Sequence, residues 1–209
     1  MYLSWDTYYR YANKTLFILT FLLTAHLAMA DEVPARVVVE RFQTGILAVM
    51  KEAEQLSVKE RYDRLTPYID EAFHVPLMIR VATGSFWKQA SKSQKQRLTA
   101  AFKHMSISTL ATFFDSYSGQ TFETVGEKPG QQMTFLVQTR IVDVDKSYVD
   151  IAYVMKKINN RWFVVDVIVD RGISELKVRK SEYRRLLKTS GVEGLILALN
   201  DKANQLISE

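Results

Sequence analysis

The sequence contains no cysteine among its 209 residues and only three histidines. A disulfide framework and a lipid-modified N-terminal cysteine are therefore both excluded. Only His74 and His104 lie beyond the first thirty residues, and no spacing of carboxylates around them suggests a zinc site. We therefore expect no metal and no resident cofactor.

The sequence also lacks the motifs of the common enzyme classes. It has no glycine-rich phosphate loop and no Gly-x-Ser-x-Gly elbow. Asp166 alone invites an enzymatic interpretation, because a carboxylate desolvated in the apolar segment 163–168 could act as a base. The alternative, which we favour, is that Asp166 accepts hydrogen bonds from a neighbouring strand or a helix end.

A long hydrophobic run occurs only near the N-terminus. The apolar segment 16–27 follows Arg10 and Lys14 and precedes Ala28-Met29-Ala30, and it is shorter than the ~20 residues of a spanning helix. These features predict a cleavable secretory signal peptide over residues 1–30 and one mature domain over 31–209. The predicted mature chain has 26 basic and 22 acidic residues, a mild excess that argues against nucleic-acid binding.

Apolar residues at helical spacing predict an α-helical first half. Helices are expected over 35–56, from residue 58 until Pro67 interrupts the pattern, over 68–73 and over 77–82, and over 92–117. Capping boxes at Ser57 to Glu60 and Ser91 to Gln94 begin the second and the longest of these helices. Two more helices are predicted over 174–189 and 192–207, with Gly191 between them.

From residue 121 the hydrophobic period changes from 3.6 to 2, which is typical of strands. Strands are predicted over 121–127, 133–142, 148–157 and 161–170, with joins short enough for antiparallel hairpins. One alternate set in the three longer strands is apolar; it includes Phe163 and Val165 on the last strand. We therefore predict an α+β fold in which amphipathic helices cover one face of a curved, four-stranded antiparallel sheet.

Several short stretches, taken together, resemble one protein family. They are DEAF (70–73), GSFWKQAS (84–91), QKQR (94–97) with Ala101-Phe102, YSGQ (117–120), Trp162 with Asp166-Val167, GIS (172–174) and GVEGL (191–195). In this order and spacing they resemble the MlaC family of periplasmic phospholipid-binding proteins, also described as toluene-tolerance or auxiliary transport proteins. The run 167–172 is equally similar to the hopanoid-associated branch of that family.

The resemblance implies a soluble, monomeric periplasmic carrier without catalytic activity. Such carriers hold phospholipid tails in a hydrophobic cavity between helices and a curved sheet. They exchange lipid with an inner-membrane ABC transporter that has an MCE-domain subunit and with an outer-membrane lipoprotein–porin complex, which maintains outer-membrane lipid asymmetry. A hopanoid-type lipid is the alternative ligand. A small cone-fold enzyme using Asp166, and a ligand-free periplasmic adaptor, are the alternative functions.

Apolar residues that periodicity alone would place in a filled core become candidate cavity residues through this resemblance. The candidates are Phe73, Leu77, Val81, Phe102, Met105 and Phe113 on the helices, and Phe135, Val137, Val149, Ile151, Tyr153, Val165 and Val167 on the strands. A separate feature is the basic stretch 177–188. It fits either contact with anionic headgroups or an ordinary solvated helix face.

Overall fold

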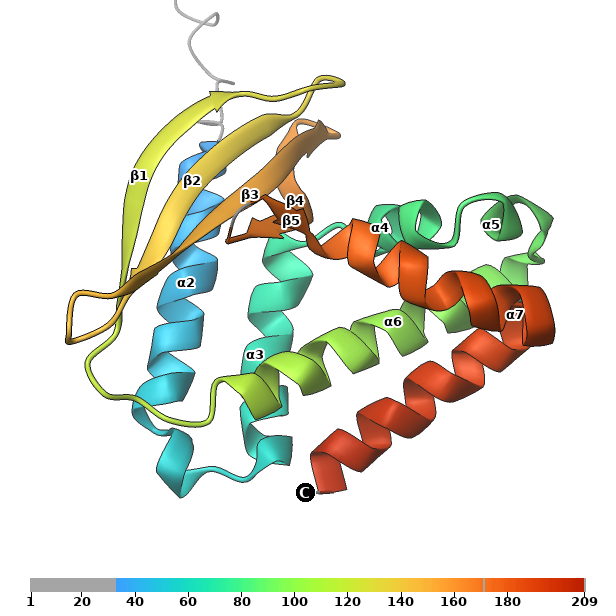
Figure 1. Ribbon diagram of the computed structural model, residues 1–209, viewed down its shortest axis with the longest axis horizontal. Coiled ribbons are helices and arrows are strands. Elements are labelled where there is room, and N and C mark those ends of the chain that lie inside the picture. The colour runs from blue at the N-terminus through green and yellow to red at the C-terminus, as the bar shows by residue number, and fades with distance from the viewer. Residues whose placement is uncertain (1–32, 171, 209) are drawn as a thin grey trace, which may run out of the picture. The chain divides into compact units, whose positions relative to one another are not determined.

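A computed structural model describes residues 33–170 and 172–208, and the predicted signal peptide lies outside them. Six helical segments come first: α2 (Ala35–Lys51), the 3₁₀ turn η1 (Ala53–Gln55), α3 (Val58–Ala72), α4 (Val75–Thr83), α5 (Ser85–Gln89) and α6 (Lys92–Phe113). The strands β1 (Thr121–Pro129), β2 (Phe135–Val142), β3 (Tyr148–Ile158), β4 (Arg161–Val169) and β5 (Ile173–Ser174) follow, and α7 (Glu175–Ser208) ends the chain. Figure 1 shows this order in space.

The strands form one antiparallel sheet in the order β1-β2-β3-β4-β5. The described sheet therefore has five strands, and the prediction of four was wrong. The additional strand, β5, consists of two residues, Ile173 and Ser174, which pair with Val169 and Ile168. Two residues are too few to produce an alternating pattern in the sequence, so β5 had no signal of its own.

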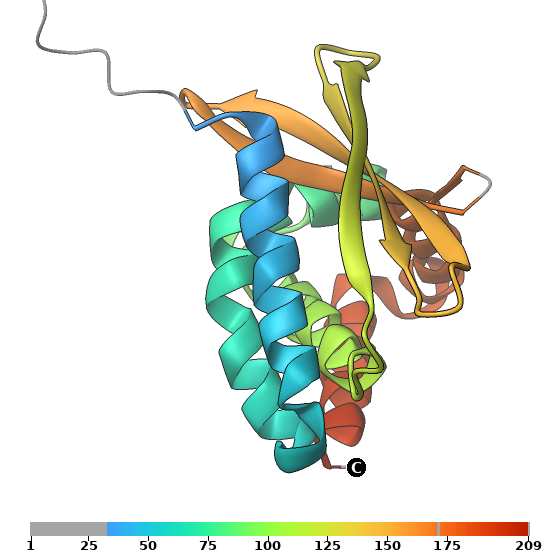
Figure 2. The same cartoon turned by 90° about the vertical axis from the view of Figure 1, so that its left-hand side faces the viewer.

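Helices pack against one face of the curved sheet, as Figures 1 and 2 show, and this confirms the predicted α+β class. α2 contacts β1, β2 and β4, while α3, α4 and α7 contact β4. The core between these layers includes an aromatic cluster, in which the Phe42 ring lies 4.8 Å from Phe73 and 6.1 Å from Tyr153, both edge to face.

Both predicted capping boxes are present. The Ser57 hydroxyl accepts a hydrogen bond from the Glu60 backbone N–H, and the Glu60 carboxylate accepts one from the Ser57 N–H at 2.8 Å. Ser91 and Gln94 make the same reciprocal pair at the start of α6. Each box satisfies two backbone donors that a helix start would otherwise leave unpaired, which fixes where these helices begin.

The helix ends differ from the predictions in three places. α3 continues through Pro67 to Ala72, because its buried stripe, Leu65, Ile69 and Ala72, holds the helix against the core despite the missing hydrogen bond. α2 ends at Lys51 and gives way to η1. α6 ends at Phe113, and Tyr117 reaches the core from the following loop rather than from a helix.

A β-bulge in β4 changes which residues face the helices. Val154 pairs with Asp166 and Met155 with Val164, so Val165 is an extra residue in the ladder. Val164 is fully buried against the helical layer. The predicted placement of Phe163 on the core face was therefore wrong, because one inserted residue reverses the alternation on one side of the bulge.

Candidate functional site

Helices cover the middle of the sheet's helix-facing surface closely. This covered part consists of Val137, Thr139, Tyr153, Met155 and Val164, all buried. The Gln43 side-chain amide on α2 donates hydrogen bonds to the Thr139 hydroxyl at 3.0 Å and to the Tyr153 hydroxyl at 3.4 Å. Burial raises the pKa of Tyr153 to about 12, so this phenol stays neutral and joins α2 to the sheet.

Toward the β2–β3 hairpin, the same surface is incompletely covered. This open end consists of Phe122, Ile141, Val149, Ile151, Val167 and Val169, none of which is fully buried. These residues lie on the helix-facing side of the sheet, like the covered part. The strand register shows this, because Ile141 pairs with Val149 and Ile151 pairs with Val169. Val149 leaves 46% of its surface exposed. The sheet thus presents apolar side chains that helices only partly shield.

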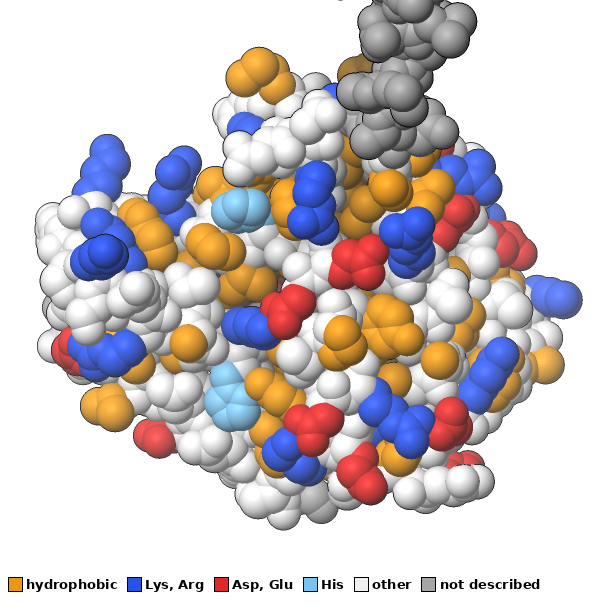
Figure 3. All heavy atoms as spheres, turned by 180° about the vertical axis from the view of Figure 1, so that it is seen from behind, with side chains coloured by type: hydrophobic (Ala, Val, Ile, Leu, Met, Phe, Trp, Pro, Cys, Tyr) orange, Lys and Arg blue, Asp and Glu red, His pale blue; other side chains and the backbone are white. Residues whose placement is uncertain are grey.

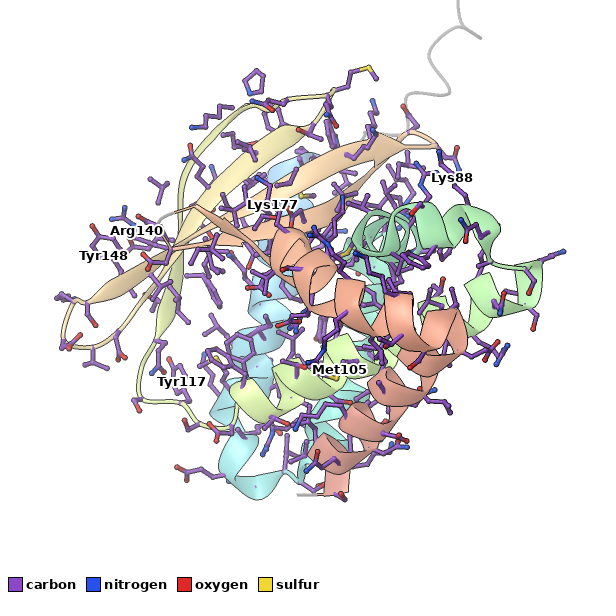
Figure 4. The ribbon with its side chains drawn as sticks, turned by 45° about the vertical axis from the view of Figure 1, so that its right-hand side comes forward. Lys88, Met105, Tyr117, Arg140, Tyr148 and Lys177 are labelled. Carbon is purple, nitrogen blue, oxygen red and sulfur yellow. The ribbon has the colours of Figure 1, made fainter. Side chains whose placement is uncertain are left out.

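The helical layer contributes half-buried apolar side chains of its own. Met105 and Leu110 on α6, and Phe114 and Tyr117 just after it, pack against the edge of the core without being enclosed. In Figure 4, Met105 and Tyr117 lie along α6 and its following loop, below the strand ends that carry Arg140 and Tyr148. The loop approaches the β2–β3 hairpin directly: a Cβ atom on Gly119 would lie 3.1 Å from the Val144 side chain. Partly exposed apolar groups therefore lie on both layers.

The structure distributes the candidate cavity residues over several environments. Eight belong to the core or pack against it: Phe73, Phe102, Met105, Phe135, Val137, Ile151, Tyr153 and Val167. Leu77 is half-buried, and Val165 is buried at the bulge, outside the main core cluster. Val149 lies on the open end, as described above.

Two candidates differ from the interior position expected for them. Phe113 is 74% exposed, and Val81 is 46% exposed. α4 buries Val75, Ile79, Ala82 and Thr83, which leaves Val81 on its outer side. Phe113 is the last residue of α6, beyond the helix's final buried position, Ala111.

Sequence reasoning missed four half-buried residues: Phe122 in the open end, and Leu110, Phe114 and Tyr117 on the helical layer. The sequence predicts one helix over 92–117, with Leu110 and Tyr117 on its apolar stripe. The break after Phe113 carries Phe114 and Tyr117 into a loop, and no local motif announced that break. Only the composition of the segment 113–122, which is rich in aromatic residues, could have pointed to them.

Asp166 accepts hydrogen bonds that connect β4 to the start of α7. Its Oδ1 accepts hydrogen bonds from the backbone N–H groups of Val167 at 2.8 Å and Leu176 at 3.1 Å, and its Oδ2 accepts one from the Ser174 hydroxyl at 2.6 Å. Ser174 in turn caps α7 by accepting from Lys177 N–H at 3.1 Å. The favoured interpretation of Asp166, hydrogen bonding to a neighbouring helix end, is confirmed.

A pocket of about 440 Å³ lies between the α4–α5 junction and the first half of α7. Residues 82–86 form one side, and Lys180, Arg184, Leu187 and Lys188 form the other. None of the candidate cavity residues lines it.

Among the described residues, no cluster of His, Asp or Glu could hold a metal ion. Within the same residues, no helix is long and apolar enough to cross a bilayer.

The structure is that of an α+β protein whose curved antiparallel sheet has one helix-covered face, part of which stays open and apolar. The family model described as MlaC protein matches residues 40–201, so the chain belongs to the MlaC family. This confirms the resemblance seen in the sequence. A solved structure with the same fold is that of a phospholipid-binding protein from Ralstonia solanacearum, determined in complex with a phospholipid. The two chains are 22% identical with a TM-score of 0.73, over 83% of this chain and 99% of the other.

Proposed function

We propose that this protein is a lipid carrier that holds acyl chains against the open end of its sheet. The observation that carries the proposal is the incomplete cover over that apolar surface, in a chain of the MlaC family. The phospholipid bound by the Ralstonia solanacearum relative supports a glycerophospholipid as the ligand, and a hopanoid-type lipid is the alternative. In this proposal, residues 31–209 act as a single lipid-binding domain after removal of the signal peptide 1–30.

Apolar burial can supply the binding energy alone. Each buried methylene contributes about 0.8 kcal/mol, so two acyl chains need no charged clamp to stay bound. The cavity proposed here forms when helices and sheet separate at the open end to admit the chains. The candidate residues Ile151 and Val167 on the sheet, and Met105 on α6, would then contact lipid. Loss of lipid would leave these side chains with fewer packing contacts.

The carrier would work in the periplasm as a monomer. It would take lipid from one membrane complex and deliver it to the other, between an outer-membrane lipoprotein–porin complex and an inner-membrane ABC transporter with an MCE-domain subunit. Outer-membrane lipid asymmetry would depend on this traffic. Catalysis is not part of the proposal, because the carboxylate of Asp166 is engaged by two backbone N–H groups and the Ser174 hydroxyl.

Two neighbouring positions on β3 provide a matched test. Val149 and Tyr148 are 46% and 54% exposed, and adjacent strand residues point to opposite faces. The test compares Val149→Glu with Tyr148→Glu after purification, extraction into organic solvent and mass spectrometry of the lipid. A carboxylate at 149 would face the acyl chains, so we expect roughly tenfold less lipid per protein in Val149→Glu only.

The wild-type protein should release lipid in stoichiometric amount, and Tyr148→Glu should match it. Circular dichroism of both variants checks that the fold is intact. A wild-type protein without lipid would contradict the carrier and favour the adaptor. Equal lipid loss in the two variants would contradict the placement of the ligand on the helix-facing side.

A further inference from the structure

The charges of the mature chain are distributed very unevenly. Residues 72–114 contain six Lys or Arg residues and no Asp or Glu. Residues 176–192 contain six more, with Glu182 as the one acidic residue. The remainder of 31–209 has fourteen basic and twenty-one acidic residues. The small net charge of the whole chain therefore conceals two segments of strong positive charge.

The fold brings these two segments together. α4, α5 and α6 each contact α7. Residues 82–86 line a pocket with Lys180 and Arg184, and the Phe102 ring lies 6.5 Å from Tyr183, so the acid-free segment lies against the basic first half of α7. Figure 4 shows Lys88 on α5 and Lys177 at the start of α7, and in Figure 3 the basic side chains at the α5–α7 end have few acidic neighbours. We call this surface, formed by α4, α5 and the first half of α7, the basic end.

Three cations of the basic end line the pocket described above. Lys180, Arg184 and Lys188 follow one another at intervals of four residues and therefore share one side of α7. Within the described residues, none of the three has an ion pair or a side-chain hydrogen bond. Ala82, Phe86 and Leu187 supply apolar walls between them. The pocket thus combines unneutralised positive charge with an apolar lining.

Nearby acidic groups are already engaged elsewhere. Glu182 and Glu175 pair with Arg179, at 3.0 and 3.9 Å. Glu193 pairs with Arg97, which together with Gln94 lowers the pKa of that carboxyl. These three carboxylates therefore pair with Arg179 and Arg97, and the cations facing the pocket remain unpaired within the part of the chain that the structure describes.

We propose that the basic end docks the protein on the surface of a bilayer that contains anionic phospholipid. Long, flexible cations spread over several helices suit a headgroup layer, in which the negative charges have no fixed positions. Val81 on α4 and Val178 on α7 are exposed apolar side chains on the same helices, as interfacial binding favours. The proposal goes beyond lipid carriage, since docking by charge needs no occupied cavity.

Vesicle co-sedimentation tests this inference. The vesicles are phosphatidylcholine alone, or phosphatidylcholine mixed with phosphatidylglycerol, at low and at high ionic strength. We expect wild-type protein to sediment with the mixed vesicles at low salt and to be released by salt. The triple variant Lys180→Glu, Arg184→Glu, Lys188→Glu should bind these vesicles roughly tenfold or more weakly.

A second triple variant, Lys128→Glu, Lys146→Glu, Lys202→Glu, has the same net charge but changes exposed residues outside the basic end. It should keep most of the binding. Equal loss of vesicle binding in both triple variants overturns the proposal. Wild-type protein that does not bind the mixed vesicles also overturns it, and an acidic protein then becomes the better partner. Lipid content, measured in parallel, should be unchanged by either variant, so a failure of docking is distinguishable from a failure of lipid carriage.

Discussion

Arg61 is a buried cation, with 8% of its surface exposed, that no carboxylate neutralises through a hydrogen bond or ion pair in the described residues. Its guanidinium instead donates to three backbone carbonyls: Ala111 at 2.8 Å, Ala53 at 3.0 Å and Leu56 at 2.7 Å. These carbonyls belong to η1, to the residue after it and to the last turn of α6. One side chain on α3 therefore connects the turn after α2 to the last turn of α6.

We expect Arg61→Met to lower the free energy of unfolding by about 3 kcal/mol, because the carbonyls of Ala111, Ala53 and Leu56 each lose the hydrogen bond from the guanidinium while the apolar stem is kept. Urea unfolding followed by circular dichroism measures this. Arg41→Met is the control, since Arg41 pairs with Glu71 on the surface at 3.2 Å, and such pairs contribute about 0–1 kcal/mol. Equal effects of the two substitutions would contradict the role given to Arg61.

Sequence reasoning could not have identified Arg61. In the segment 57–64 it is one of several charged residues on an amphipathic helix, and its acceptors are backbone atoms, which leave no trace in residue type. The role of Asp166 was easier to predict from the sequence, because a carboxylate inside an apolar strand needs hydrogen-bond partners. The sequence could predict that it accepts hydrogen bonds from a strand or a helix end, but not that α7 begins there.

At the scale of elements, the break in α7 shows how a single residue divides a helix. Gly191 has φ 64° and ψ −165°, a conformation that favours glycine, between the two predicted helices. The sequence predicted this break because helices end readily at glycine. Because of the break, both parts of α7 contribute to the core: Tyr183 and Leu187 before Gly191, and Leu195 and Leu199 after it.

Gly191→Ala should destabilise the fold by roughly 1–3 kcal/mol, because alanine is strained in that backbone conformation even where space for a methyl group exists. Thermal unfolding measures the effect. Gly126→Ala serves as its control: Gly126 has no positive φ, and its nearest neighbour to an added Cβ, Gln138 Oε1, lies 3.9 Å away. An unchanged melting temperature for Gly191→Ala would show that the break tolerates ordinary residues.

Element starts were more predictable than element ends or strand faces. The capping boxes at Ser57 and Ser91 fix two helix starts through local hydrogen bonds, so the sequence contains the full signal. The end of α6 depends on where the chain must turn to reach β1, which is a long-range requirement. The bulge at Val165 is equally non-local, since it exists only in the pairing of β4 with β3.

At the scale of the whole molecule, the α+β class could be predicted from the spacing of hydrophobic residues, which is helical in the first half of the sequence and alternating from residue 121. The sequence also predicted that the sheet buries one apolar face. It could not predict that α2 covers only the middle of that face, through Gln43 and Phe42. Which apolar residues are buried in the core and which stay partly exposed depends on this partial cover, and both groups are of the same residue types.

Removal of lipid should therefore loosen one region selectively. The covered part has protein partners in either state, whereas the open end and residues 105–117 would lose the acyl chains that complete their packing. We expect delipidated protein to exchange backbone amide hydrogens faster over 141–151 and 105–117, with little change around Val137, Tyr153 and Val164. Adding lipid back should restore protection and raise the melting temperature as its concentration increases. Hydrogen exchange read by mass spectrometry measures both regions in one experiment. Uniform exchange changes across the sheet, or none, would contradict a ligand held at the open end.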